Sequence, residues 1–128
     1  MKLITRDTDY AMRALCYLGR YPGTTVSVSE LTAHLCISRA FLRKILQVLT
    51  KEKLLISTKG VGGGFCLRKP PKEITLMRLI EIFQGGFEIS ECTLNKKRCP
   101  NTKVCTLREK LKNIEDSVRS DVKKISVA

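Results

Sequence analysis

Three cysteines lie close together in the last third of this 128-residue sequence, at a spacing that suits metal chemistry. Cys92, Cys99 and Cys105 form the pattern C-x6-C-x5-C, and the segment around them is rich in Lys and Arg. Neighbouring positive charge lowers the pKa of thiols and offsets the charge of clustered thiolates. Zinc sites mostly pair cysteines about two to four residues apart, so the wider spacing here favours an iron-sulfur cluster. The same three thiols could instead form disulfides on oxidation, without iron.

The other three cysteines have a different setting. Cys16, Cys36 and Cys66 fall within apolar helix or strand patterns, where a free cysteine behaves as a small hydrophobic side chain. We therefore predict that they are core thiols. The N-terminal sequence carries charges at positions 6, 7 and 9 instead of the apolar stretch of a signal peptide. We expect a cytoplasmic protein with no membrane partner, and a cytoplasmic chain is not expected to need a disulfide framework.

The net charge of the chain points to a polyanionic partner. Lys and Arg number 24 against 12 Asp and Glu, which gives a formal net charge of +12. A surplus of this sign favours nucleic acid or an anionic membrane face, and a merely solvated basic surface is the alternative. The length is that of one domain, and an apolar fraction of 43% is enough for a hydrophobic core.

Apolar periodicity and capping signals predict the helices and strands that carry these residues. Helices are predicted over about residues 8–19, 28–35, 39–52, 76–84 and 104–125, and strands over 54–58 and 65–68. Ser27 and Glu30 form a capping box for the second helix, while Ser38 and Thr75 can cap the third and fourth. The predicted fold class is mainly α with a small β-hairpin: a winged helix-turn-helix followed by a long C-terminal helix.

The last helix carries a narrow apolar seam of the kind that pairs helices in coiled coils. The seam consists of Leu107, Leu111, Ile114, Val118, Val122 and Ile125. We interpret it as a dimerisation surface, and the alternative is that the stripe packs onto the rest of the same chain.

The third predicted helix has the features of a DNA recognition helix. Its apolar stripe of Leu42, Ile45, Leu46 and Leu49 turns inward, which leaves a polar face with donors for guanine edges and phosphates. The predicted DNA-binding residues on this helix are Ser38, Arg39, Ala40, Arg43, Lys44 and Gln47. A solvated charged face is the alternative, but no Asp or Glu occurs from Thr32 to Lys51.

The hairpin that follows has a glycine-rich turn with basic neighbours. Lys59 and Gly60 are predicted to contact DNA, with Lys59 on a phosphate strand or in the minor groove. The turn sequence GVGGGF lacks the Lys-Ser/Thr of a phosphate-binding loop and the third glycine of a dinucleotide fingerprint, so we discount nucleotide binding. A flexible turn without any ligand is the other alternative.

The whole chain resembles the family of dimeric winged-helix bacterial regulators that includes IscR, NsrR and CymR. The resemblance rests on the start MKLITRDTDYAMRAL, the segment ISRAFLRKIL, the wing KGVGGGFCL, and three cysteines before a long C-terminal helix. It implies a homodimer that binds operator DNA, with a DNA-binding domain over 1–86, a cluster-binding loop over 87–105 and a dimerisation helix over 106–128. It also implies that Cys92, Cys99 and Cys105 hold the cluster, because members without the triad act without one.

The family pattern also suggests a fourth cluster ligand. IscR-like members use a histidine shortly after the third cysteine, whereas the only histidine here is His34. NsrR-like members use an aspartate from the first helix of the other subunit, and the motif T-D-x-A-x-R places Asp9 at that position. Asp7 and Glu109 are the fallback ligands, and the alternative for Asp9 is an acid that favours a helix N-terminus. The NsrR-like pattern favours a 4Fe-4S over a 2Fe-2S cluster, although relatives often show C-x5-C-x5-C, one residue shorter than here.

The resemblance thus implies a transcription regulator, without enzymatic activity or a small-molecule substrate, whose operator affinity depends on an iron-sulfur cluster. The cluster would sense nitric oxide, redox state or iron supply. Two alternatives stay open: a thiol-based redox switch without a cluster, and an iron-sulfur electron carrier or enzyme. Against the latter, the sequence offers no Ser/His/Asp or paired-carboxylate constellation and carries a separate basic helix.

Overall fold

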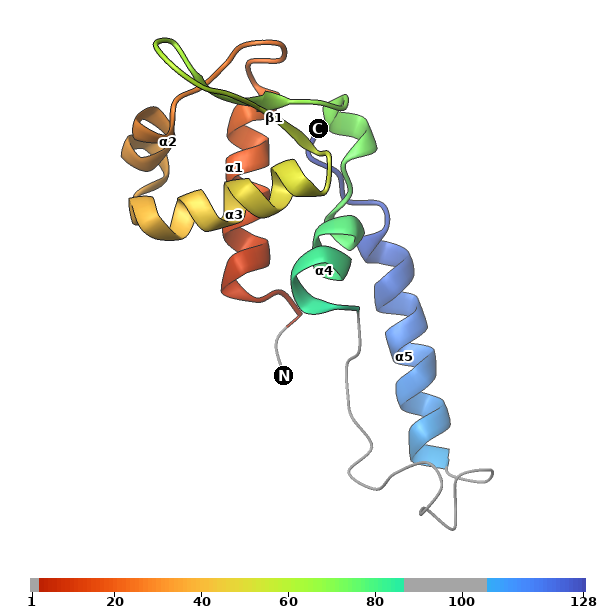
Figure 1. The fold of residues 1–128 in the computed structure, drawn as a ribbon. Coiled ribbons are helices and arrows are strands. Elements are labelled where there is room, and N and C mark those ends of the chain that lie inside the picture. Colours follow the sequence, from red (N-terminus) through yellow and green to blue (C-terminus); the bar gives the residue numbers. More distant parts are fainter. Residues whose placement is uncertain (1–2, 87–105) are drawn as a thin grey trace.

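The computed structural model describes residues 3–86 and 106–128. Along these residues the chain forms α1 (Arg6–Gly19), α2 (Val28–Leu35), α3 (Arg39–Lys51), β1 (Leu55–Thr58), β2 (Gly64–Leu67), a short 3-10 helix η1 (Pro71–Glu73), α4 (Leu76–Gln84) and α5 (Thr106–Val122). Helix α1 runs through the middle, with α2 on one side, α3 crossing in front of it, the hairpin across one end, and α4 and α5 on the other side (Figure 1). The predicted winged helix-turn-helix is confirmed. No helix in the described ranges is both long and apolar enough to cross a membrane.

The helices begin where the capping signals predict. The side chains of Ser27, Ser38 and Thr75 accept hydrogen bonds from backbone N–H groups in the first turns of α2, α3 and α4, which satisfies donors that a helix start leaves unpaired. Glu30 differs from its predicted role in a capping box. Its Oε1 accepts a hydrogen bond from the Tyr17 hydroxyl at 3.0 Å, so the side chain ties α2 to α1.

The apolar core lies between α1, α2, α3 and the base of the hairpin. Leu42, Ile45, Leu46 and Leu49 of α3 are all buried, as their spacing predicts. The prediction of three core thiols is only partly right, because Cys16 and Cys66 are half-buried whereas Cys36 is exposed. Cys36 ends α2 in the left-handed conformation, with φ of 55°, and the next residue, Ile37, takes the buried position instead.

The hairpin is pinned to the helical domain. Strands β1 and β2 pair antiparallel, with Leu55 opposite Leu67 and Thr58 opposite Gly64. The Val26 and Phe65 backbones form an isolated bridge, with both N···O distances at 2.8 Å. A Cβ on Gly64 would lie 2.2 Å from the Val26 carbonyl oxygen, so a side chain at this position would push the hairpin away from the segment before α2.

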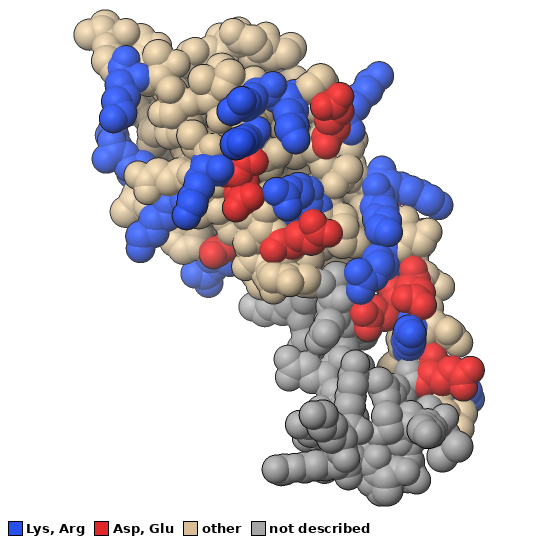
Figure 2. Space-filling model, turned by 45° about the vertical axis from the view of Figure 1, so that its right-hand side comes forward, with Lys and Arg blue, Asp and Glu red and all other residues tan. Residues whose placement is uncertain are grey.

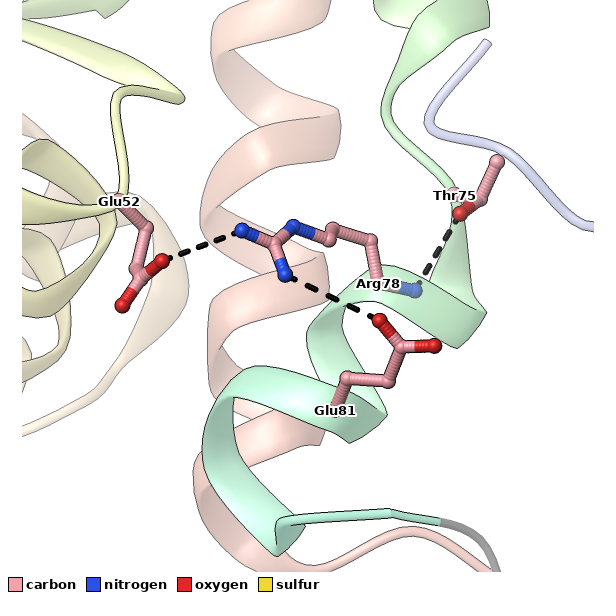
Figure 3. Close-up of polar contacts among 4 residues, drawn as sticks. All are labelled: Glu52, Thr75, Arg78 and Glu81. Atoms are coloured by element: carbon pink, nitrogen blue, oxygen red, sulfur yellow. Dashed lines mark hydrogen bonds and ion pairs between the residues drawn. The ribbon is translucent and has the colours of Figure 1, made fainter.

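Helix α4 is joined by polar contacts to two other helices. At its start, Arg78 Nη2 lies 3.1 Å from Glu52 Oε2 at the end of α3, and Arg78 Nη1 lies 3.8 Å from Glu81 Oε2 (Figure 3). At its end, Gln84 Oε1 accepts hydrogen bonds from the Thr5 N–H at 3.0 Å and from the fully buried Thr8 hydroxyl at 2.8 Å. The orientation of α4 is therefore fixed against both α3 and the start of α1.

Helix α5 is shorter than its periodicity predicts. It ends at Val122 instead of near Ile125, because the residues after it turn back to the chain before α4. Ser126 pairs with Thr75, and the Val127 N–H donates to the Ile74 carbonyl at 2.9 Å. Val127 is buried in the main core. The C-terminal residues therefore belong to the N-terminal domain in space.

The apolar seam of α5 is only partly covered. Val122 is buried against Leu76, Met77 and Ile80 of α4, and Val118 packs beside them. Leu107 and Ile114 are 66% and 53% exposed, and the early part of α5 stands apart from the helical domain (Figure 1). The stripe packs onto its own chain at one end and leaves its other end uncovered by the described residues.

Candidate nucleic-acid interface

A groove of about 570 Å³ lies between α3 and the hairpin. Most residues that line it carry cationic, amide or hydroxyl groups. They are Ser27, Val28, Ser29, Arg39, Arg43, Gln47, Thr50, Ser57, Thr58, Lys59, Gly60, Gly63, Gly64 and Phe65. The fold therefore brings the predicted recognition helix and the predicted wing to the same surface.

Helix α3 presents three of its predicted residues to this groove. Because its apolar stripe faces the core, Arg39, Arg43 and Gln47 are held outward one turn apart along the groove wall. Ala40 and Lys44 are also exposed but do not line the groove. Ser38 is exposed too, and its hydroxyl accepts a hydrogen bond from the Phe41 N–H at 3.4 Å. Its structural role is therefore to begin α3.

The hairpin supplies the opposite wall. Lys59 and Gly60 line the groove, as the prediction of a shared DNA-binding surface requires. Sequence reasoning missed the hydroxyl groups of Ser29, Thr50, Ser57 and Thr58, and it recognised Ser27 only as a helix cap. No local pattern marks these residues, because they come from three elements that only the tertiary fold brings together.

The charge of the groove differs from that of the α5 side of the molecule. Among the groove-lining residues there are three cations and no acid. On the face turned toward α5, acidic and basic side chains are interleaved (Figure 2), and pairs such as Arg119 Nη2 with Glu115 Oε1 at 3.0 Å neutralise each other. An open groove with donors and net positive charge suits a sugar-phosphate strand.

Asp9, the predicted fourth cluster ligand, lies on a second surface hollow. This hollow of about 470 Å³ is lined by Ile4, Thr5, Arg6, Asp9, Tyr10 and Arg13. The Asp9 carboxylate is 42% exposed and pairs with Arg13 Nε at 3.2 Å. Its neighbour Tyr10 makes an edge-to-face contact with Phe41 at a centroid distance of 5.4 Å, which joins the hollow to the first turn of α3.

The predicted cluster cysteines, Cys92, Cys99 and Cys105, lie outside the described residues. Within residues 3–86 and 106–128, no group of three or more His, Cys, Asp or Glu side chains is placed to hold a metal. The fallback ligands Asp7 and Glu109 are exposed on α1 and α5. Burial raises the pKa of the Cys16 thiol, and the nearby Arg20 partly opposes this rise, so Cys16 is suited to packing more than to thiolate chemistry.

Comparisons with known proteins agree with this geometry. Residues 4–128 match the Rrf2 family model, described as an iron-dependent transcriptional regulator. The chain is 33% identical over 107 residues to the HTH-type transcriptional regulator NsrR of Oceanobacillus iheyensis. The aligned residues cover 82% of this chain and 73% of the relative.

Solved structures show the same fold. CymR, the global cysteine regulator of B. subtilis, superposes with a TM-score of 0.77 at 21% identity, over 99% of this chain and 94% of that one. T. potens IscR superposes with a TM-score of 0.76 at 20% identity, over 99% of this chain and 83% of the other.

Proposed function

This chain belongs to the Rrf2 family of transcriptional regulators, and from that premise we propose that it is a homodimer whose operator affinity is controlled by an iron-sulfur cluster. As a member of this family it is a DNA-binding regulator and not an enzyme, so the alternative of an iron-sulfur enzyme is set aside. A regulator of chromosomal DNA would act in the cytoplasm, as the sequence predicts. The proposed signal is nitric oxide, redox state or iron supply.

The observation that carries the DNA-binding part is the groove shared by α3 and the wing. We propose that Arg39, Arg43 and Gln47 enter the major groove and that the adjoining phosphate strand lies in the protein groove, against Lys59. Ser38, Ala40, Lys44 and Gly60 complete the proposed contact surface. The operator would consist of two half-sites about one DNA turn or more apart, because a symmetric dimer reads two copies of one sequence.

Replacing Arg43 by Ala tests this interface. If Arg43 contacts a base, the variant should bind selected operator DNA more weakly by roughly 1 to 3 kcal/mol. Lys72→Ala is the matched control, because Lys72 is exposed on η1 and does not line the groove. Fluorescence anisotropy with a duplex selected from a random library measures both affinities. Equal affinities for Arg43→Ala, Lys72→Ala and the unaltered protein would remove Arg43 from the interface.

The exposed half of the α5 seam supports the proposed homodimer. Leu107 and Ile114 would cost free energy if they stayed in water, and a second copy of α5 offers the same apolar seam. In this arrangement residues 1–86 bind DNA, 87–105 hold the cluster and 106–128 dimerise. The last residues have an additional role, because Val127 packs into the DNA-binding domain. Sedimentation velocity across a concentration series tests the dimer.

The proposed cluster ligands are Cys92, Cys99 and Cys105 of one subunit and Asp9 of the other. Asp9 fits such a role, because its half-exposed carboxylate borders an open hollow that a second copy could reach. The NsrR-like pattern favours a 4Fe-4S cluster, which when bound would supply redox-active iron that a carboxylate holds less firmly than thiolate. For Asp9 to bind the cluster, its ion pair with Arg13 would have to break. The contact between Tyr10, next to Asp9, and Phe41 would then transmit the change to the start of α3.

A thiol switch without iron is the second candidate, because Cys92, Cys99 and Cys105 could form disulfides on oxidation. Anaerobic purification separates the two, because a cluster gives visible absorption with iron and sulfide, whereas a thiol switch gives colourless protein. A variant with Cys92, Cys99 and Cys105 changed to Ser should lose iron. Changing Cys16, Cys36 and Cys66 to Ser is the matched control and should retain it. Colourless, iron-free protein after anaerobic reconstitution would contradict the cluster proposal.

Asp9 is tested separately from the cysteines. Asp9→Asn should shorten the lifetime of the visible absorption in air or change its form, while the unfolding temperature stays close to that of the unaltered protein. Asp121→Asn is the matched control, since Asp121 is an exposed acid that pairs with a cation close to it in the chain, Lys124, and is not a candidate ligand. Identical spectra and lifetimes for the two variants would exclude Asp9 as a ligand.

A further inference from the structure

The glycine-rich tip of the wing forms a hydrogen-bonded turn. The Gly63 N–H donates to the Gly60 carbonyl at 3.0 Å, so Val61 and Gly62 occupy the two central positions of the turn. Gly62 has a φ of 76°, the sign that a type II turn requires at its third residue. A Cβ on Gly63 would lie 2.4 Å from the Thr58 carbonyl oxygen. The tip therefore has one defined outward corner.

Val61 is that corner. Its relative exposure is 110%, the highest of the large apolar side chains among the described residues, and its two neighbours are glycines. A valine that touches nothing in the chain adds nothing to the core, and turns ordinarily favour Gly, Pro, Asn, Asp or Ser. The wing thus presents a single apolar side chain on a narrow tip, beside a groove lined by Lys59, Arg39 and Arg43.

We propose that Val61 is a specificity-determining contact that enters the minor groove of the operator and selects A·T base pairs. This inference rests on the proposed DNA-binding function. Charge complementarity argues for DNA as the occupant, because the wall beside the tip carries cations and no acid. The minor groove is only about 6 Å wide, and a corner flanked by two glycines is narrow enough to enter it.

The base preference follows from the chemistry of valine. Both kinds of base pair place acceptors in the minor groove, and a G·C pair adds the guanine 2-amino donor. Valine cannot accept a hydrogen bond, so burying the guanine amino group beneath it would leave a donor without a partner. Beside an A·T pair the methyl groups meet the adenine edge and the sugars. Lys59, which lines the groove, is then placed for a phosphate and not for the minor groove.

The test is selection of duplexes from a random-sequence library by the full-length protein, purified anaerobically. Val61→Thr is the informative variant, since threonine has nearly the same shape but carries a hydroxyl that can accept from guanine. Val61→Ala shortens the side chain, and Lys59→Ala removes a cation from the groove wall. Ile56→Ala is the matched control, because Ile56 is a 46% exposed apolar residue of the same hairpin that does not line the groove.

We expect the unaltered protein to select A·T at the positions flanking the α3 contact, with affinity about tenfold above G·C there. Val61→Thr should reduce this ratio to less than about threefold while leaving the unfolding temperature unchanged. Lys59→Ala should weaken all sequences alike and lower the salt dependence, and Ile56→Ala should select the same flanks as the unaltered protein.

The outcomes separate this inference from the function on which it rests. If the unaltered protein selects a defined site but Val61→Thr and Val61→Ala show the same A·T ratio, the role of Val61 is wrong and DNA binding stands. A defined site without any A·T preference at its flanks would also overturn the inference. If no sequence is enriched above background, the proposed recognition surface is wrong, and the minor-groove contact of Val61 is wrong with it.

Discussion

Helices α3 and α5 carry apolar stripes of the same periodicity, but only the α3 stripe is fully buried. All four stripe residues of α3 lie in the main core, whereas α5 buries Val122 and leaves Leu107 and Ile114 more than half exposed. Helix α3 is enclosed by α1, α2 and the hairpin, while α5 packs mainly on α4, in a cluster that Met12 of α1 borders. Apolar spacing therefore identifies a stripe but does not determine which surface covers it.

The two helices also have different proposed roles. The buried stripe of α3 fixes which polar residues face the groove, so its packing would serve the proposed DNA recognition. The exposed part of the α5 seam would serve the proposed association with a second chain. Changes in α3 should therefore act within one chain, and changes in the early part of α5 should act between chains.

The largest expected effect is the difference in stability between a Leu→Ala substitution in α3 and one in α5. Leu46→Ala removes a fully buried side chain of α3 and should lower the free energy of unfolding by about 2 to 5 kcal/mol. Leu107→Ala, at a position that is 66% exposed, should change the unfolding of a dissociated chain by less than about 0.5 kcal/mol. Chemical denaturation at low protein concentration measures both, and equal losses would remove the contrast between the helices.

A charge in the exposed seam should weaken association. Ile114→Asp would place a carboxylate in the proposed helix-helix contact and raise the dimer dissociation constant by about 100-fold or more, since burying an unpaired charge is costly. Asn113→Asp is the control, because Asn113 is an exposed neighbour outside the seam. Sedimentation equilibrium measures the two constants. Similar values for both variants would mean that the seam is not the dimer contact.

The polar network between α4 and α1 should have a moderate effect. Gln84→Leu leaves the buried Thr8 hydroxyl and the Thr5 N–H without their acceptor, and should lower the free energy of unfolding by about 1 to 3 kcal/mol. Gln84→Glu keeps an acceptor and should recover most of the loss. Thermal unfolding followed by circular dichroism measures both losses. An equal loss in the two variants would show that stability does not depend on a hydrogen-bond acceptor at position 84.

The smallest effect is expected for the ion pair between α3 and α4. Arg78 and Glu52 are 46% and 40% exposed, so their coupling should be about 0.2 to 1 kcal/mol and should shrink as salt is added. A double-mutant cycle with Arg78→Met and Glu52→Gln isolates this value. A coupling that salt leaves unchanged would mean that the contact (Figure 3) is better shielded than its exposure indicates.

Much of the fold was predictable because its signals are local. The caps Ser27, Ser38 and Thr75 and the stripe of α3 depend on residues within a few positions of one another, so sequence reading placed those helices correctly. The end of α5 at Val122, before its apolar periodicity stops, was not predictable in this way. It depends on Val127 reaching the core and on Ser126 pairing with Thr75, which no local pattern records.

The candidate site divides along the same line. The sequence predicts a basic recognition helix, a glycine-rich wing and a cysteine motif, since each is a short run of suitable residue types. It is in the folded chain that Arg39, Arg43 and Gln47 share a groove with Lys59, that Cys36 is exposed and that Val61 is fully exposed at the tip of the wing. These facts depend on how elements far apart in the chain pack, because packing determines which side of an element meets solvent.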